Sequence, residues 1–540
     1  MSGPVRTIGA TGLKAALHDG GEIALLDARE EVPFDARHLL MAACVPLSRL
    51  ELLADACVPR RSARVVWCDD GEGLAQRAAL RMVSLGYTDV SVLAGGIAAW
   101  EAAAFRIYSG VHVPSKAFAE VVEHKAGTPW ITAEELKALI DSKVDIALFD
   151  SRSYEEFHGN SIPTAISVPG AELVYRFADL VRSPETMVVV NCGGRTRSII
   201  GAQSLINAGV PNKVVSLKNG TQAWHLAGFP ILKGSTARPP AVSPAGQAAA
   251  QAAADRVARR FSIARIDPAT LARWQADSAG RMLYVFDVRT PEEYAAGHIP
   301  GMKNVPGGQL VQETDRHAAT WGARVVLVDD DGVRAVMTAH WMKQMGWDIA
   351  AMTVDMRADG RETGPWTPRV LGLDGLAVPA IGAATLHERA QAGAVSIVDV
   401  DWSRDYRDGH IPGAWWGIRS RLAEIVPKLP PSDSVVFTSA DGILAKLAAA
   451  DLKKTASVPA FALDGGTAAW REAGYPLERG ADRMATAPDD IRARAREQTE
   501  NVEEAMRAYL SWEIALADQM ATDDDQRFRI LAGQRLLGQA

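Results

Sequence analysis

Cysteine is scarce in this 540-residue sequence, and no apolar stretch is long enough to cross a bilayer. The sequence contains only Cys44, Cys57, Cys68 and Cys192, and they form no CxxC pair. This pattern excludes a disulfide framework and gives no support to a zinc or iron–sulfur site. The first residues lack the layout of a signal peptide. We therefore predict a cytoplasmic chain with reduced thiols and no membrane partner.

Positive charge is not in excess either, because 58 Lys and Arg residues stand against 65 Asp and Glu residues, a formal net charge of −7. A net acidic chain argues against nucleic acid as a partner. Apolar residues make up 48% of the sequence, which is too many for a disordered chain. The length exceeds what one hydrophobic core supports, so we expect about three to five domains.

The sequence repeats one pattern four times. Each copy has a short apolar run that ends in an acid, with Arg or Asp two residues later: IALLDAR (23–29), IALFDSR (146–152), LYVFDVR (283–289) and VSIVDVD (395–401). A second apolar run follows: RVVW (64–67), MVVVN (187–191), RVVLV (324–328) and SVVF (434–437). Copies one, two and four close on a Gly-Gly or Asn-Gly turn followed by Trp100, Trp224 or Trp470. Strands that alternate with helical segments predict an α/β fold of parallel sheets flanked by helices.

These landmarks divide the chain into four domains and a helical extension, at 1–108, 129–233, 262–366, 376–480 and 486–540. The Pro-rich and then Ala-rich segment 234–258 is predicted to be a flexible joint that runs into a short helix. The extension has one apolar stripe at helical spacing, formed by Val502, Met506, Tyr509, Leu510 and Ile514. Two roles fit this stripe: a cap on the last domain, or a homodimer contact through the C-terminal helices.

The segment NCGGRTRS (191–198) has the properties of a nucleophile in an anion site. Cys192 lies between a predicted strand and a predicted helix, and the two following glycines let backbone N–H groups converge. The positive end of the helix dipole and two arginines favour an anion. Such surroundings lower the pKa of a thiol, so we predict a nucleophilic Cys192 thiolate. The predicted substrate-binding residues are Gly193, Gly194, Arg195, Thr196, Arg197 and Ser198.

Taken together, the repeated strand ends, the GHIPG turns (297–301 and 409–413), the Cys192 loop and the closing turns resemble the rhodanese (thiosulfate sulfurtransferase) family. The resemblance covers nearly all of 1–480 as four tandem copies. It implies small domains, each with a central five-stranded parallel sheet, and sulfur transfer through a persulfide on Cys192. It implies no metal and no organic cofactor.

The length of the loop separates two chemistries of this fold. Here Arg197 stands at the fifth position after Cys192, and Ser198 stands at the sixth. In the related phosphatases the loop is one residue longer and carries Arg at the sixth position. The shorter loop favours sulfur transfer over phosphatase or arsenate reductase activity. The donor stays open, because the pair of arginines differs from the best-known thiosulfate and mercaptopyruvate loops.

The other three copies lack a cysteine at the corresponding position. Counting back from the glycine that ends the following helix places Asp69 and Asp329 there, with Cys68 one residue early, and the end of the strand SVVFT (434–438) places Ser439 there. A carboxylate or an unactivated hydroxyl is a poor substitute for a thiolate. We therefore interpret domains 1, 3 and 4 as inactive, with a relay role for Cys68 as the alternative. The acids Asp329 to Asp331 are interpreted as a solvated acidic loop rather than a cation site.

Two hypotheses follow. The first is an enzyme in which Cys192 takes a sulfane sulfur from a small anionic donor such as thiosulfate and passes it to cyanide or a thiol. The second is a scaffold or sulfur-carrier protein whose inactive copies recognise partners. Several other polar residues are predicted to be structural: Asp150 and Arg152 as an internal pair, His298 and His410 as braces of the GHIPG turns, and Trp224 and Trp470 as packing residues.

Overall fold

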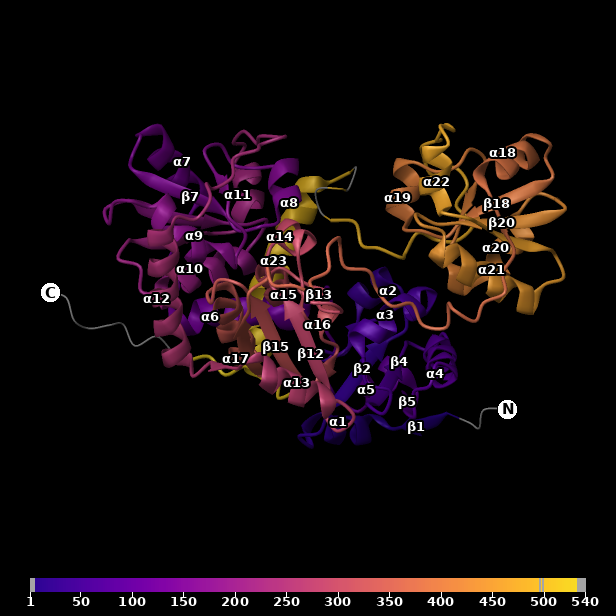
Figure 1. Ribbon diagram of the computed structural model, residues 1–540, viewed down its shortest axis with the longest axis horizontal. Coiled ribbons are helices and arrows are strands. Elements are labelled where there is room, and N and C mark those ends of the chain that lie inside the picture. The colour runs from indigo at the N-terminus through magenta and orange to yellow at the C-terminus, as the bar shows by residue number, and fades with distance from the viewer. Residues whose placement is uncertain (1–4, 495–496, 498–499, 532–540) are drawn as a thin grey trace.

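The computed structural model describes residues 5–494, 497 and 500–531, which form four α/β domains and a C-terminal helix (Figure 1). In chain order, domain 1 runs from β1 to α5, domain 2 from β6 to α11, domain 3 from β11 to β16, and domain 4 from β17 to α22. Each domain has a parallel sheet flanked by helices, so the predicted fold class is confirmed. The predicted extension 486–540 lies partly outside the described residues.

The strands are short, and the four sheets share one strand order except for β14, which lies in domain 3 by sequence and pairs with the sheet of domain 1. Those of domain 1 are β1 (Arg6–Ile8), β2 (Ile23–Asp27), β3 (Ala43–Cys44), β4 (Arg64–Cys68) and β5 (Asp89–Leu93). Those of domain 2 are β6 (Trp130–Ile131), β7 (Ile146–Asp150), β8 (Ile166–Ser167), β9 (Met187–Asn191) and β10 (Val214–Leu217). Those of domain 3 are β11 (Ala264–Arg265), β12 (Leu283–Asp287), β13 (Lys303–Asn304), β14 (Thr320–Trp321), β15 (Arg324–Asp329) and β16 (Asp348–Thr353). Those of domain 4 are β17 (Ala380–Ile381), β18 (Val395–Asp399), β19 (Trp415–Trp416), β20 (Ser434–Thr438) and β21 (Ala460–Leu463).

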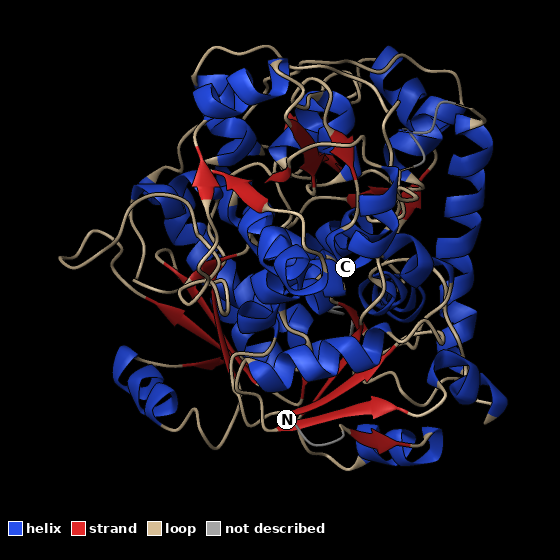
Figure 2. Ribbon diagram, turned by 90° about the vertical axis from the view of Figure 1, so that its right-hand side faces the viewer, coloured by secondary structure: helices blue, strands red, loops and turns tan. Residues whose placement is uncertain are grey.

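Helices connect these strands and cover both faces of each sheet (Figure 2). Domain 1 has α1 (Ala10–His18), α2 (Glu31–Ala36), α3 (Leu50–Cys57), α4 (Leu74–Ser84) and α5 (Gly96–Ala102). Domain 2 has α7 (Ala133–Asp141), α8 (Tyr154–Gly159), α9 (Glu172–Leu180), α10 (Thr196–Ala208) and α11 (Gly220–Leu226). Domain 3 has α13 (Pro268–Ala276), α14 (Pro291–Ala296), α15 (Gly307–Gln312), α16 (Thr314–His317) and α17 (Arg334–Gln344). Domain 4 has α18 (Ala383–Gln391), α19 (Ser403–Asp408), α20 (Leu422–Ile425), α21 (Ile443–Thr455) and α22 (Gly466–Glu472), and short 3-10 turns at Leu47–Arg49, Arg419–Arg421 and Val426–Lys428 add to domains 1 and 4.

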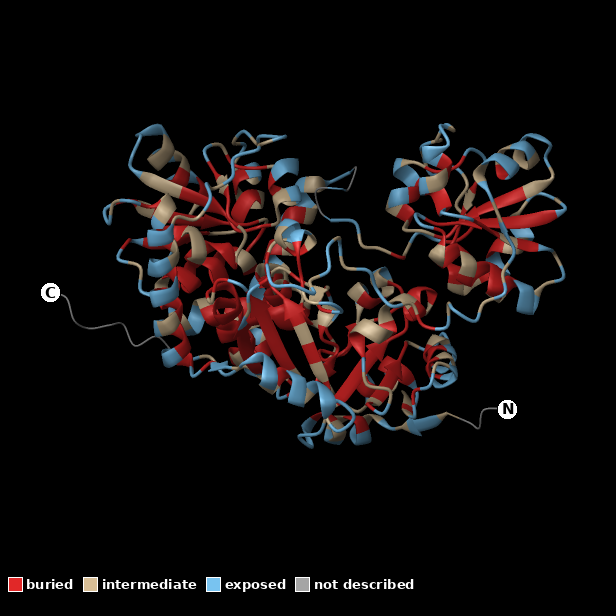
Figure 3. Cartoon of the chain, viewed as in Figure 1, coloured by how far each residue is buried: buried red, intermediate tan, exposed pale blue. Residues whose placement is uncertain are grey.

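The central strand of each sheet is buried almost throughout because helices cover both faces (Figure 3). The order in domain 2 is β6-β10-β9-β7-β8, which places β9 at the centre. Val188, Val189 and Val190 of β9 are all fully buried. The carboxyl end of β9 therefore meets the loop of Cys192 at the middle of the sheet edge, where ligands bind in open α/β sheets.

Domains 1, 2 and 3 share one hydrophobic core. Domain 3 also donates a strand to domain 1, because β14 pairs antiparallel with β2, with Trp321 opposite Ile23 and Thr320 opposite Ala24. The indole of Trp321 donates a hydrogen bond of 3.1 Å to the carbonyl of Met41. The sequence did not predict this sixth, antiparallel strand, since the two partners are about 300 residues apart and β14 has only two residues.

Domain 4 has its own hydrophobic clusters and stands apart from the other three sheets in Figure 1. It contacts domain 1 through a buried ion pair in which Arg419 Nη1 lies 2.6 Å from Glu51 Oε2. Arg81 of domain 1 binds the same carboxylate at 2.6 Å. A bidentate arginine on a buried carboxylate fixes the orientation of the two domains.

Three further helices lie outside the domains: α6 (Val113–Ala126), α12 (Pro244–Phe261) and α23 (Val502–Ala521). The joint predicted to run into a short helix instead leads into α12, which has 18 residues because its alanines bury one face against α9 and α17. In the described part of the chain, α23 packs mainly against α6, so its interpretation as a cap on the last domain is wrong. None of the described helices is long and apolar enough to cross a membrane.

Candidate active site

Cys192 lies in the short loop between β9 and α10. The side chain is 2% exposed, and its Sγ atom lies 3.5 Å from the hydroxyl oxygen of Ser198 in the first turn of α10. That hydroxyl donates a hydrogen bond of 2.8 Å to the carbonyl of Arg195. The sulfur atom thus faces the helix N-terminus, as the order of strand, loop and helix predicted.

The closing Asn-Gly turn holds the backbone of this loop. Thr221 donates its backbone N–H to the Cys192 carbonyl at 2.8 Å, and Gln222 donates to the Gly193 carbonyl at 3.2 Å. Gly220 has φ of +56°, and a Cβ atom at this position would clash with the carbonyl oxygen of Cys192. The glycine of the repeated closing motif is therefore required by its close approach to the loop.

The same close approach identifies the equivalent positions in two other domains. A Cβ atom at Gly96 would clash with the Asp69 carbonyl, and one at Gly466 would clash with the Ser439 carbonyl. The side chain at this position also accepts a hydrogen bond from the backbone N–H six residues later. The pairs are Ala75 to Asp69 at 2.9 Å, Ala335 to Asp329 at 2.9 Å and Ala445 to Ser439 at 3.3 Å. The structure thus confirms the sequence alignment of Asp69, Asp329 and Ser439 with Cys192.

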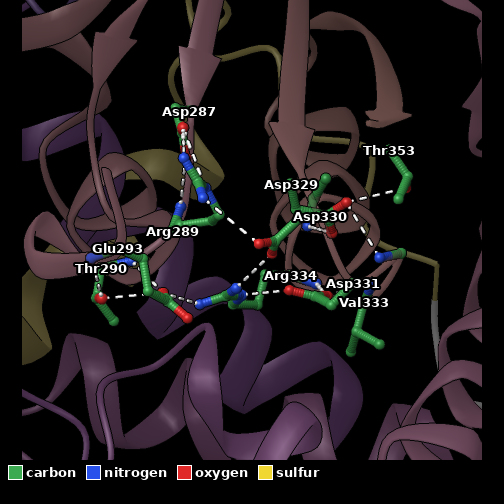
Figure 4. Close-up of polar contacts among 12 residues, drawn as sticks. Asp287, Arg289, Thr290, Glu293, Asp329, Asp330, Asp331, Val333, Arg334 and Thr353 are labelled. Atoms are coloured by element: carbon green, nitrogen blue, oxygen red, sulfur yellow. Dashed lines mark hydrogen bonds and ion pairs between the residues drawn. The ribbon is translucent and has the colours of Figure 1, made fainter. Parts of the chain in front are cut away.

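In domain 3 the loop is filled by its own carboxylates (Figure 4). Asp329 accepts hydrogen bonds from Ala335, Gly332 and Thr353, and Asp331 accepts from the backbone of Val333 and Arg334. The guanidinium of Arg334 is fully buried, and Glu172 of domain 2 binds it at 2.8 Å. The interpretation of Asp329 to Asp331 as a solvated acidic loop holds only for the exposed Asp330. It is wrong for Asp329 and Asp331, which are buried acceptors that satisfy the start of α17.

Cys68 points into the core of domain 1 as the last residue of β4. It is fully buried, and burial together with the charge of Asp27 raises its pKa well above the usual range. Cys44 and Cys57 also have pKa values that burial raises. These thiols have the properties of core residues, and Asp69 rather than Cys68 occupies the position equivalent to Cys192.

Arg195 is turned toward α6 and is bound there by two acids. Its Nε atom lies 2.7 Å from Glu120 Oε1, its Nη2 atom also pairs with Glu123, and its Nη1 atom donates to Asn219 at 3.1 Å. The segment 109–129 shows no strand signal, and it supplies this pair of acids through a helix. The positive charge of Arg195 is therefore neutralised locally, and its structural effect is to connect the Cys192 loop to α6.

The charge of Arg197, unlike that of Arg195, acts on the Cys192 sulfur. Its Nη1 atom lies 2.6 Å from Glu156 Oε2 and 2.8 Å from Gln309 Oε1 of domain 3. Burial raises the pKa of the Cys192 thiol, and the charge of Arg197 and the hydroxyl of Ser198 only partly offset that effect. The predicted lowering of this pKa is thus not seen in the structure, because desolvation of the thiolate outweighs a cation that is already shared with Glu156.

The helix α23 covers the Cys192 loop, which the sequence analysis did not foresee. Glu513 is 1% exposed, and its Oε1 atom accepts hydrogen bonds from Thr196 Oγ1 at 3.1 Å and Tyr509 at 2.9 Å. Met506 and Leu510, on the same helix face, are buried within the chain. The signal in the sequence was that Glu513 follows Tyr509 and Leu510 at helical spacing, which places a carboxylate on the apolar face of α23.

The residues predicted to be structural have the predicted partners. Arg152 forms a buried pair with Asp150, with 2.6 Å between Nη2 and Oδ2. The Nδ1 atoms of His298 and His410 lie within hydrogen-bond distance of the carbonyls of Tyr294 and Tyr406. The indoles of Trp224 and Trp470 donate hydrogen bonds of 2.9 Å to the carbonyls of Pro230 and Pro476.

The fold, the closing turns and the Cys192 loop define a class of protein. A family model for the rhodanese-like domain matches four segments, at residues 10–103, 132–227, 267–356 and 382–473. These segments cover more than half of the chain, and the chain therefore belongs to the rhodanese-like domain family in four tandem copies.

Two relatives illustrate the extent of the similarity. A solved structure of a thiosulfate sulfurtransferase from Pseudomonas aeruginosa is similar over 98% of this chain and 100% of its own, with 46% identity and a TM-score of 0.94. A curated protein, the HTH-type transcriptional regulator Rv0324 of Mycobacterium tuberculosis, is 35% identical over 91 residues. The latter alignment covers 17% of this chain and 39% of the length of the regulator, so the shared part is about one domain.

Proposed function

We propose that this chain is a sulfurtransferase that moves a sulfane sulfur from a donor such as thiosulfate to cyanide or a thiol through a persulfide on Cys192. One observation carries the proposal: of the four structurally equivalent loop positions, Asp69, Cys192, Asp329 and Ser439, only Cys192 has a thiol. The similarity over its full length to a protein named thiosulfate sulfurtransferase supports the same assignment.

In the first half-reaction the Cys192 thiolate attacks the outer sulfur of thiosulfate. A new S–S bond forms to Cys192, the S–S bond of thiosulfate breaks, and sulfite leaves with the electron pair of that bond. The backbone amides of residues 193–198 and the positive end of α10 stabilise the negative charge on the persulfide. Arg197 lowers the energy of the thiolate and persulfide through its charge.

In the second half-reaction the acceptor attacks the outer sulfur of the persulfide. Cyanide leaves as thiocyanate, or a thiolate leaves as a new persulfide, and the electron pair of the broken bond returns to Cys192 as thiolate. Two half-reactions through one covalent intermediate predict ping-pong kinetics. No step uses a metal or an organic cofactor.

The Cys192→Ser variant tests this proposal. We expect it to lose essentially all thiosulfate:cyanide transfer, because a serine hydroxyl without a base is a weak nucleophile. Mass spectrometry of the wild-type protein after thiosulfate treatment should show one added sulfur, about 32 Da, on the peptide that contains Cys192. Cys57→Ser, at a buried core thiol, is the matched control. Transfer activity that survives in Cys192→Ser would contradict the proposal.

A second candidate function is a scaffold or sulfur-carrier role, and the replaced nucleophiles of domains 1, 3 and 4 favour it. In these domains the side chain of Asp69, Asp329 or Ser439 accepts a hydrogen bond from a backbone N–H of the loop. That N–H is equivalent to one that would stabilise the Cys192 thiolate. If the chain were only a scaffold, thiosulfate treatment would add no sulfur to Cys192. A donor panel of thiosulfate, 3-mercaptopyruvate and glutathione persulfide, applied to wild type and Cys192→Ser, separates the two functions.

The remaining assignments are also proposals: a cytoplasmic location, no nucleic-acid partner, and a homodimer through the C-terminal helices. The apolar face of α23 is already buried inside its own chain at Met506, Leu510, Leu516 and Met520. A homodimer would therefore use surface beside this buried face, where Ile514 is exposed. Sedimentation equilibrium of the wild type and of Ile514→Lys tests that contact, and a wild-type monomer would overturn it.

A further inference from the structure

The carboxylate of Glu513 reaches the Cys192 loop from outside domain 2. Its Oε1 atom is bound by Thr196 and Tyr509, as described above, and its Oε2 atom points at the middle of the loop. A Cβ atom at Gly194 would lie only 2.9 Å from that oxygen. The loop has glycine at this position, and the space beside its backbone is occupied by a carboxylate from α23.

The Oε2 atom of Glu513 is buried and has no hydrogen-bond partner among the described residues. A buried carboxylate oxygen without a partner is costly, because it has lost water and gained nothing in return. Such an atom, aimed into a predicted substrate site, points to a ligand that donates a hydrogen bond or carries positive charge.

The charges around the loop do not favour a dianion. Arg195 is paired with Glu120 and Glu123, and Arg197 is paired with Glu156. Lys116 of α6 is buried beside α23 and lies 5.3 Å from the ring of Tyr509 and 4.9 Å from that of Trp512. The ammonium group of Lys116 and the carboxylate of Glu513 attract each other. Carboxylates thus pair with both arginines of the loop, and Glu513 adds a further negative charge that acts on Cys192, so the anion-attracting effect that the two arginines predicted is offset.

We propose that Glu513 is a specificity-determining residue of the Cys192 site, which disfavours an anionic group next to the reacting sulfur and favours a cationic or hydrogen-bond-donating one. This inference rests on the proposed function, in which Cys192 reacts with sulfur donors. Thiosulfate is then a weak donor, and the persulfide of a small aminothiol, with its ammonium group near the sulfur, is a better one.

Charged methanethiosulfonates test this inference without turnover. The Cys192 thiolate attacks their sulfenyl sulfur, the S–S bond breaks, and methanesulfinate leaves with the electron pair, so a mixed disulfide forms. The aminoethyl reagent is a cation and the sulfonatoethyl reagent is an anion of similar size. Their rates are measured by mass spectrometry of the Cys192 peptide, and the readout is the ratio of the anionic to the cationic rate.

We expect Glu513→Gln to raise this ratio on the order of tenfold, because it removes one negative charge near the sulfur and preserves the shape of the side chain. Glu513→Asp keeps the charge and should keep the wild-type ratio within about twofold. The control Glu504→Gln removes the same charge from an exposed position on the same helix and should leave the ratio unchanged. A ratio that is equal in Glu513→Gln and Glu504→Gln would overturn the inference.

A turnover measurement completes the test. In Glu513→Gln, kcat/KM for thiosulfate should rise on the order of tenfold, mainly through a lower KM, and kcat/KM for cysteamine persulfide should fall. A variant that only disturbs packing would lower both. If no sulfur is transferred by any variant, the proposed function fails, while the ratio of labelling rates still decides the role of Glu513.

Discussion

At the scale of single residues, the site is controlled by how burial and charge act on one thiol. The sequence indicated two arginines around Cys192, and the structure shows that both are paired with carboxylates. Burial therefore raises the Cys192 pKa above its ordinary value, and Arg197 and Ser198 reduce this increase without cancelling it. The thiolate therefore becomes more abundant as the pH rises.

The pH dependence of Cys192 labelling tests this balance. With neutral iodoacetamide, the rate on the wild type should still rise between pH 8 and pH 9, because the raised pKa keeps the thiol protonated there. Arg197→Met should lower the rate at pH 8 by about tenfold, because loss of the cation raises the Cys192 pKa further.

Arg182→Met, at an exposed arginine of the same domain, serves as the control and should behave like wild type. Equal rates for Arg197→Met and Arg182→Met at pH 8 would show that Arg197 does not act on the thiol. Circular dichroism of each variant checks that the overall secondary structure is unchanged.

At the scale of elements, the closing turn and the nucleophile loop form one unit. The repeated Gly before the Trp-containing helix exists because Gly96, Gly220 and Gly466 pass directly over the carbonyl of the residue at the nucleophile position. Domain 3 lacks a helix after β16, and there the backbone N–H of Val354 donates to the Asp329 carbonyl instead. The closing turn therefore fixes the backbone of the nucleophile loop.

The role of Gly220 is tested by comparing Gly220→Ala with Gly228→Ala. Gly228 has a similar backbone conformation but open space around its Cα atom. Gly228 has φ of +75°, and no atom lies within 4 Å of the position that a Cβ atom would take there. Gly228→Ala should therefore cost only the left-handed conformation, about 1–2 kcal/mol. Gly220→Ala adds a clash with the Cys192 carbonyl and should lower the melting temperature further. Differential scanning calorimetry gives both values, and equal losses would contradict the close approach.

Much of the fold could be predicted from the sequence, since the apolar runs and turns are local signals. The strand ends at Asp150 and Asn191 and the start of α10 all lie where the pattern placed them. The coverage of Cys192 by α23 could not be predicted, because it joins residues more than 300 positions apart. The pairing of Arg195 with Glu120 was missed for a related reason: no periodic pattern reveals which helix packs on a loop.

At the scale of the whole molecule, domains 1 to 3 share one core, whereas domain 4 has its own clusters and contacts domain 1 through a buried ion pair. Burial opposes ionisation of Glu51, but Arg419 and Arg81 hold its pKa at about 2. The pair therefore persists at neutral pH. Its contribution to stability is present above the ordinary pKa of a glutamate and is lost as the pH falls toward 2.

Arg419→Met should loosen this attachment, because it leaves Glu51 buried with only Arg81 as a partner, at a cost of about 3–5 kcal/mol. Small-angle X-ray scattering should show a larger radius of gyration, and limited proteolysis should cut faster between domain 4 and α23. Arg479→Met, at an exposed arginine of domain 4, is the control. An unchanged radius of gyration would show that other contacts hold domain 4.

The two-residue strand β14 makes the sheet of domain 1 depend on a segment of domain 3. During synthesis, domain 1 emerges from the ribosome with the outer edge of β2 at Ile23 and Ala24 uncovered, and that edge stays open until Thr320 and Trp321 arrive. An open edge strand invites pairing with foreign chains. A gene fragment that encodes the first copy alone would therefore yield an aggregation-prone product, and recombination could not exchange this copy as a self-contained cassette.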